Sequence, residues 1–140
     1  MLKETVTYID FNGTERTEDC WFNMSKIDLM EFLKSSESDP TAKLRSALSS
    51  SDITSMMLFF KDFMLAAYGE RSVDGRRFIK SKEISEAFGQ SMAFDALFMR
   101  LMNEEGSISN FIYGVIPNDL AAAISAQDKM NAAQGVIPMV

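Results

Sequence analysis

Residues 2–22, LKETVTYIDFNGTERTEDCWF, decide how this chain begins to fold. Polar and apolar side chains alternate over residues 2–9, which is the period of a β-strand. Asn12-Gly13 is a strong signal for a tight turn, because both residues tolerate the positive φ that such a turn needs. The return strand covers residues 14–22. We therefore expect an N-terminal β-hairpin, which must pack on helices or gain strands from another copy, since two strands alone are only marginally stable.

Beyond the hairpin, apolar residues recur with a helical period as far as Pro117. Capping residues predict the helix starts, which are Ser25, Pro40, Asp52, Ser81, Ser91 and Ser107, with a further helix over 119–134 that Asp119 caps. The longest helix covers 52–68 with Gly69 as its C-terminal stop. Residues 69–80 follow as a charged loop.

The predicted fold class is α+β, with a hairpin over 2–22 followed by a mostly helical bundle of about five helices over 25–117. A chain of 140 residues and 15.7 kDa is one domain of ordinary size. Residues 1–117 form that domain, and the Ala-rich residues 118–140 form a tail that is either helical or flexible. The 11 Met and 11 Phe indicate a soft core or a permissive binding surface.

Composition excludes several classes of function. The 14 basic and 20 acidic residues give a net charge of −6, which argues against a nucleic-acid-binding protein. The chain has no histidine, so the usual general base and the commonest zinc ligand are absent. The single cysteine, Cys20, suits a reducing compartment. Residues 1–20 do not resemble a secretory leader, and no apolar run approaches the roughly 20 residues that cross a bilayer. We expect a cytoplasmic protein with no membrane or nucleic-acid partner.

No catalytic pattern is visible. The spacing of Gly69 and Gly75 does not fit a phosphate-binding loop. The carboxylate pairs are Glu83/Glu86 and Glu104/Glu105. Both pairs lie at polar helix ends, where solvated surface charge is expected rather than acid–base chemistry. Cys20 has no histidine to activate it and is expected to be a buried apolar residue. The sequence therefore predicts no enzyme activity, no metal and no cofactor.

The chain resembles the tail assembly chaperones of long-tailed, non-contractile bacteriophages and prophages of Gram-positive hosts. The resemblance is carried by YIDFNGTERTED (8–19), FN (22–23), FKD (60–62), AYGERS (67–72), DGRRFIK (74–80), SEAF (85–88) and FIYGVIP (111–117). It rests on the order and spacing of these segments across most of 1–117. The tail past Pro117 and the high Met content depart from the short forms of that family.

The resemblance implies a binding function. Such chaperones bind the long, helical, apolar tape measure protein and keep it soluble while tail tube subunits polymerise around it. They are absent from the finished virion. A longer product of translational frameshifting shares the N-terminal part and recruits the tube protein. Several copies would line the client, so self-association through an edge of the hairpin is also expected.

A client-binding strip is predicted on two helices. Phe59 and Phe63 widen the apolar arc of helix 52–68 to roughly 200°, about twice that of a one-sided surface helix. This helix is therefore either central in the bundle or exposes an apolar edge. Met92 and Met99 lie together on the side of their helix away from its core face. We expect these four residues to contribute to client binding.

A basic cluster is the second predicted surface. It consists of Arg71, Arg76, Arg77, Lys80 and Lys82, and the first four form the predicted docking loop around a turn at Asp74-Gly75. These residues form either a solvated loop whose positive charge offsets part of the protein's net negative charge, or a loop that docks onto an acidic partner.

Two other functions remain open besides the small enzyme that the missing motifs disfavour. A structural virion protein of the tail or the head–tail junction would stay in purified particles. A generic helical interaction module would share the same apolar surface.

Overall fold

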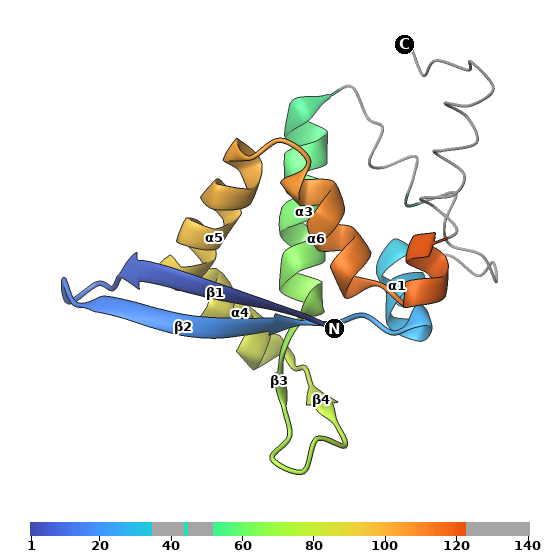
Figure 1. The fold of residues 1–140 in the computed structure, drawn as a ribbon, viewed down its shortest axis with the longest axis horizontal. Coiled ribbons are helices and arrows are strands. Elements are labelled where there is room, and N and C mark those ends of the chain that lie inside the picture. Colours follow the sequence, from blue (N-terminus) through green and yellow to red (C-terminus); the bar gives the residue numbers. More distant parts are fainter. Residues whose placement is uncertain (35–43, 45–51, 123–140) are drawn as a thin grey trace.

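Antiparallel strands and helices make up the part of the chain that the structure describes (Figure 1). This computed structural model describes residues 1–34, 44 and 52–122. The strands are β1 (Leu2–Ile9), β2 (Glu15–Phe22), β3 (Tyr68–Arg71) and β4 (Phe78–Ile79), in the sheet order β1-β2-β3-β4. The helices are α1 (Lys26–Leu33), α3 (Ile53–Ala67), α4 (Lys82–Gly89), α5 (Met92–Asn103) and α6 (Ser107–Val115). The predicted α+β class is confirmed.

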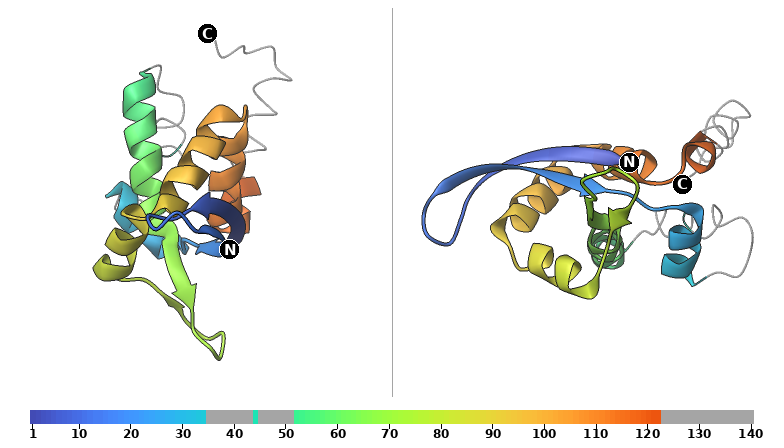
Figure 2. Two further views of the ribbon diagram at one scale, coloured as in Figure 1. Left: turned by 90° about the vertical axis from the view of Figure 1, so that its left-hand side faces the viewer. Right: turned by 90° about the horizontal axis from the view of Figure 1, so that it is seen from below.

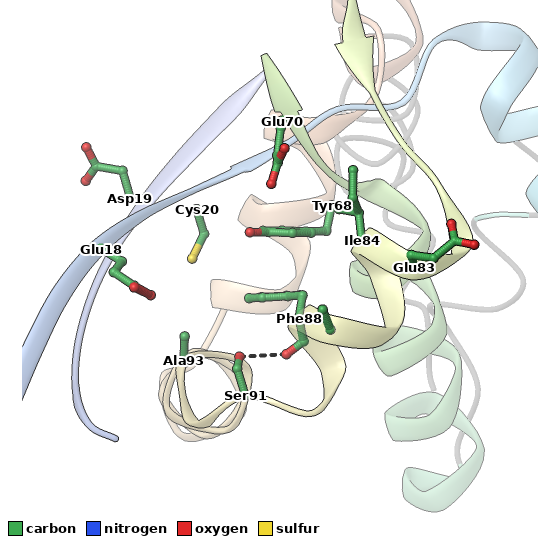
Figure 3. Close-up of a pocket in the computed structure, with 11 residues that line it drawn as sticks. Glu18, Asp19, Cys20, Tyr68, Glu70, Glu83, Ile84, Phe88, Ser91 and Ala93 are labelled. Carbon is green, nitrogen blue, oxygen red and sulfur yellow. Dashed lines mark hydrogen bonds between the residues drawn. The ribbon is translucent and has the colours of Figure 1, made fainter. Parts of the chain in front are cut away.

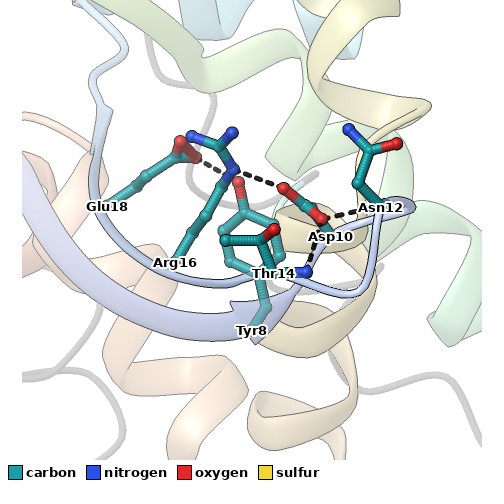
Figure 4. Close-up of polar contacts among 6 residues, drawn as sticks. All are labelled: Tyr8, Asp10, Asn12, Thr14, Arg16 and Glu18. Carbon is teal, nitrogen blue, oxygen red and sulfur yellow. Dashed lines mark hydrogen bonds and ion pairs between the residues drawn. The ribbon is translucent and has the colours of Figure 1, made fainter.

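The N-terminal hairpin is confirmed, and β1 pairs with β2 along its whole length. The connection covers residues 10–14 and is longer than a two-residue turn. Asp10 shapes it, because its carboxylate accepts hydrogen bonds of 2.9 Å from the backbone N–H groups of Asn12 and Thr14 (Figure 4). Gly13 supplies the positive φ of 80°. The hairpin gains its neighbouring strands from its own chain rather than from another copy.

Cross-strand side chains hold the outer end of the hairpin together (Figure 4). The Arg16 Nε lies 2.5 Å from Asp10 Oδ2, and this bond lowers the pKa of Asp10 below its ordinary value. The Tyr8 hydroxyl donates to Glu18 Oε1 at 2.6 Å. Such pairs between facing strands stabilise the register of a two-stranded ribbon that extends beyond the helices.

Four predicted N-caps are confirmed, namely Ser25, Asp52, Ser81 and Ser91. Each side chain accepts a hydrogen bond from a backbone N–H in the first turn of its helix. Ser107 is not a cap, because Gly106 at φ 80° occupies that position. The Ser107 hydroxyl donates instead to Glu104 at 3.0 Å. Asp119 is not a cap either, since residues 118–122 are already helical.

Residues 69–80 contain most of a second hairpin, so the predicted loop is wrong. α3 ends at Ala67, and Tyr68 is already extended, with φ −69° and ψ 140°. β3 pairs with the end of β2, and β4 folds back onto β3. β3 forms its backbone hydrogen bonds with β2, which is far away in the sequence. A local sequence pattern therefore does not indicate this strand. The predicted turn at Asp74-Gly75 is confirmed, with Gly75 at φ 74°.

Gly69 belongs to β3 and is not the helix stop that the sequence predicts. A Cβ atom at Gly69 would lie 2.6 Å from Cε2 of Phe78 and 2.7 Å from the carbonyl oxygen of Ile79. The missing side chain therefore lets β4 close onto β3. This close approach, and not a left-handed backbone, explains the glycine.

The core lies between the sheet and the helices, with Phe22 at its centre. The fully buried Phe22 ring contacts Tyr68, Phe88 and Phe111 edge-on, with centroids 5.7, 5.8 and 4.9 Å away. α5 and α6 contact β1, while α4 contacts β3 (Figure 2). One side chain of β2 thus joins β3, α4 and α6. Such aromatic pairs contribute about 0.5–1.5 kcal/mol each beyond their buried area.

Some predictions fall outside the described residues. Of the helix predicted after Pro40, only Leu44 is described, and it is helical and fully buried. The predicted helix 119–134 is described only to residue 122. Leu120 lies in the same core, three residues past the predicted domain end at 117. Within the described part of the chain, no helix combines the length and hydrophobicity needed to cross a membrane.

The close approach at Gly69 gives a test of the second hairpin. We expect Gly69→Ala to lower the free energy of unfolding by about 1–3 kcal/mol, because the new methyl group must displace a ring edge and a backbone carbonyl. Urea unfolding followed by circular dichroism measures the loss.

Gly89→Ala is the matched control. Its Cβ meets only the flexible end of Leu65, at 3.1 Å, so we expect a change of less than about 1 kcal/mol. Equal effects of the two substitutions would contradict the packing described for β3 and β4.

Candidate interaction surfaces

An open groove of about 640 Å³ lies between β2, β3, α4 and α5 (Figure 3). Its floor is the stacked pair of Tyr68 and Phe88, whose ring centroids lie 3.9 Å apart with planes 5° from parallel. Its acidic lining residues are Glu18, Asp19, Glu70 and Glu83. Among the described residues, none that lines the groove is basic. The groove therefore combines an aromatic floor with a negatively charged lining.

Strand alternation positions these side chains. Glu18 and Cys20 lie two residues apart on β2 and face the groove together (Figure 3). Tyr68 and Glu70 do the same on β3. Phe88 comes from the last turn of α4. The sequence shows each alternation, but it does not show that β3 lies beside β2, so the groove could not be predicted.

The acidic side chains affect the groove electrostatically. Burial, together with the smaller effect of the charges of Glu18 and Asp19, raises the pKa of the Cys20 thiol to about 11. Burial also raises the pKa of Tyr68, with additional effects from Cys20, Glu70 and Glu18. Both shifts oppose the formation of another anion. The groove thus disfavours a thiolate nucleophile and favours cationic groups.

The predicted client strip is brought together only in part. Phe63 is fully buried and stacks with Phe59 at 6.5 Å, so its side chain offers no surface in this structure. Phe59 and Met92 are half-buried. Met99 is 49% exposed and is the member with a large accessible apolar surface. The physical reason is α1, whose Phe32 packs against both phenylalanines of α3.

The structure divides the predicted basic cluster. Arg76 and Arg77 are exposed in the connection between β3 and β4. Arg71 lies in β3 with its guanidinium over the Trp21 ring, 4.2 Å from the centroid. Docking of this loop onto an acidic partner stays a prediction for these three arginines.

Lys80, also part of the predicted docking loop, makes contacts within the fold. Its Nζ lies 3.2 Å from Asp28 Oδ2 and donates to the Ala66 carbonyl at 3.3 Å. It thereby joins the segment after β4 to α1 and to the end of α3. Burial raises the pKa of Asp28, but hydrogen bonds from Ser25 and the charge of Lys80 outweigh it, and the net pKa is lowered.

Two apolar side chains at the hairpin ends are exposed, which the sequence alone did not predict. Phe11 is 79% exposed in the β1–β2 connection, and Val73 is fully exposed in the β3–β4 connection. An apolar residue inside a turn segment rich in Asp and Gly is the signal that could have found them. On α3, Ile53 and Leu58 are also exposed. These residues supply apolar surface outside the core.

The remaining predicted groups have modest roles. Lys82 pairs with Glu86 across one helical turn at 3.9 Å, and Glu104 accepts the Ser107 hydrogen bond. Such exposed pairs contribute little to stability. Across the described ranges, no group of three or more Cys, Asp or Glu side chains could hold a metal ion.

The outer edge of β1 is partly covered. Arg100 of α5 donates to the Thr5 carbonyl at 3.1 Å and pairs with Glu4. A side chain bonded to an edge carbonyl occupies a group that another strand would use. Self-association through this edge stays a prediction.

Comparison with known proteins gives a family match. A family model described as phage tail assembly chaperone matches residues 1–137. No curated protein and no solved structure matches the chain. The match spans both hairpins and all the helices named above.

The environment of Cys20 predicts low reactivity. We expect the folded protein to react with a thiol reagent about a hundredfold more slowly than the urea-unfolded chain at pH 7.5, because the thiol is buried and its pKa is raised. Absorbance after mixing with Ellman's reagent measures both rates, and Cys20→Ser provides the baseline. Equal rates would show that the groove admits the reagent and stabilises the thiolate.

Asp28 predicts a pH dependence of stability. Its folded-state pKa lies below the ordinary value of 3.8, so its carboxylate stabilises the fold above that pH. This contribution is lost as the pH falls through the lowered pKa. We expect Asp28→Asn to cost about 1 kcal/mol near pH 7 and progressively less below pH 3.8. Urea unfolding at several pH values measures the difference, with the exposed Asp62→Asn as control. A cost that is unchanged in acid would contradict this role.

Proposed function

The chain belongs to the phage tail assembly chaperone family, and we propose that it binds the tape measure protein through an apolar helical surface and keeps it soluble. In this role it supports assembly of the tail tube around its client. The match over residues 1–137 is the observation that carries the proposal. A long client with repeated apolar faces needs a partner that tolerates variation in its contacts.

Exposed apolar side chains on α3 and α5 support this proposal. Leu58 of α3 and Met99 of α5 are each about half exposed, and Ile53 at the start of α3 is more so. Methionine adapts to irregular apolar partners because its side chain is unbranched and polarizable. These residues form the proposed client surface, to which the half-buried Phe59 and Met92 add their accessible edges.

We propose that the protein acts by binding and not by catalysis. Its buried thiol has a raised pKa, which makes it a poor nucleophile. The carboxylates of the groove lie beside an aromatic floor. The chain contains no histidine that could form an acid–base pair with them. A chaperone for an apolar client requires accessible surface rather than a reactive group.

We propose that the protein acts in the host cytoplasm and is absent from the mature virion. A longer product of frameshifting, with the same N-terminal part, would recruit the tail tube protein. The alternative role, a structural subunit of the tail or the head–tail junction, differs in one observable respect. Mass spectrometry of purified virions would detect a structural subunit at stoichiometric level.

Co-expression with the cognate tape measure protein tests the client role. We expect a soluble complex with the wild-type chain and about fivefold weaker recovery with Met99→Ser, because an exposed contact residue contributes about 1 kcal/mol to binding. Pull-down followed by quantification of the soluble client measures the recovery.

Lys61→Ser, at an exposed polar position of α3, is the control and should leave recovery unchanged. Thermal unfolding distinguishes contact from stability, since loss of an exposed methionine should move the midpoint little. An insoluble client in the presence of folded wild-type chain would refute the proposal. A large fall in the Met99→Ser midpoint would place the client surface elsewhere.

A further inference from the structure

Arg71, the last residue of β3, and the β3–β4 connection form a preorganised basic tip, which we define as residues 71–77. The Asp74 carboxylate accepts hydrogen bonds from the Ser72 hydroxyl at 2.7 Å and from the Arg76 backbone N–H at 3.0 Å. The Ser72 hydroxyl in turn accepts from the Arg77 backbone N–H at 3.0 Å. These bonds fix the turn before any partner binds, which lowers the entropy cost of docking.

The tip carries unpaired charge and apolar surface together. Within the described residues, neither Arg76 nor Arg77 has an ion-pair partner. Val73, which follows Arg71 and precedes this arginine pair in the sequence, is fully exposed. Figure 1 shows the β3–β4 hairpin projecting away from the helices. The tip therefore presents two free guanidinium groups and one apolar side chain to a partner.

The groove between β2, β3, α4 and α5 is complementary to the tip, because it combines acidic side chains with an aromatic floor. Glu70 and Glu83 line it with no ion-pair partner among the described residues. Glu18, another acidic residue of the lining, accepts a hydrogen bond from the Tyr8 hydroxyl. The Tyr68–Phe88 stack offers an apolar floor. A volume of about 640 Å³ has room for a few side chains rather than a whole element.

The tip cannot reach the groove of its own chain. β3 forms one wall of the groove through Tyr68 and Glu70, and the tip continues from the same strand in the direction away from the helices (Figures 1 and 3). The complementary groove is therefore that of another molecule. A contact between two different surfaces of one chain is heterologous and repeats from copy to copy.

We propose that the basic tip of one copy docks into the acidic groove of a second copy, with Arg76 and Arg77 against Glu70 and Glu83 and Val73 toward the aromatic floor. Each copy has one tip and one groove, so the contact builds a head-to-tail chain or a ring. This self-association uses neither the edge of β1 nor the apolar residues of α3 and α5. It goes beyond the proposed client binding and does not depend on it.

Two charge-reversal variants test the contact. Arg76→Glu/Arg77→Glu reverses the tip, and Glu70→Arg/Glu83→Arg reverses the groove. We expect each variant alone to associate at least about tenfold more weakly than wild type, because like charges then face each other. An equimolar mixture should recover association, since both tip–groove pairs in the mixture are again of opposite charge.

Sedimentation equilibrium of the purified full chain measures the association over a range of concentrations. Salt should weaken wild-type association between about 50 and about 500 mM, because exposed charges are screened. Lys61→Glu, an exposed charge reversal on α3, is the control and should associate like wild type. Circular dichroism verifies that each variant is folded. If a reversal variant unfolds, Arg76→Gln/Arg77→Gln removes the tip charge without repulsion and should still weaken association.

Three outcomes would overturn the proposal. The first is a wild-type chain that stays monomeric across the concentration range, and the second is a mixture that fails to restore association. The third is a groove variant that associates normally but no longer recovers the tape measure protein, which would assign the groove to the client. Failure of client binding with intact self-association would refute only the function proposed above.

Discussion

The burial of Phe22 is the interaction on which the rest of the structure depends. Its ring is fully enclosed and contacts aromatic rings from β3, α4 and α6. Elements far apart in the sequence therefore meet at the end of a single strand. Phe22 also pairs with Tyr68 through the backbone, so the side-chain packing and the sheet register reinforce each other. A strand that carried a polar residue there would leave the helices without a common apolar anchor.

The register of β3 against β2 then decides where the charges lie. Because side chains alternate along a strand, Tyr68 and Glu70 face the groove while Arg71 faces Trp21 on the other side. A slip of one residue would exchange these faces and bring an arginine into the groove. Gly69 protects this register by allowing β4 to approach closely. The acidic groove and the basic tip are thus two results of one pairing.

The apolar and the charged surfaces are suited to different partners. Exposed residues such as Leu58 and Met99 interact through burial of area, which is non-directional and tolerates changes in the partner. Charged groups on a fixed turn require a defined geometry and respond to salt. Sequence periodicity predicted a strip that includes both Met99, which is half exposed, and Phe63, which is buried with Phe32 of α1 against its ring. A helical wheel shows which residues share a face and not which neighbour occupies it.

The sequence by itself determined the features that depend on local hydrogen bonds and periodicity. The N-terminal hairpin, four of the helix caps and the burial of Cys20 follow from alternation, turn residues and serine or aspartate side chains near their own backbone. The family resemblance could likewise be read from ordered segments. Only the tertiary structure decided that residues 68–79 extend the sheet, that Lys80 joins two helices, and that acidic side chains surround Phe88. Those features depend on the free edge and the apolar face of β2, which lies some fifty residues earlier in the chain, and long-range contacts of this kind leave no periodic signal in either partner.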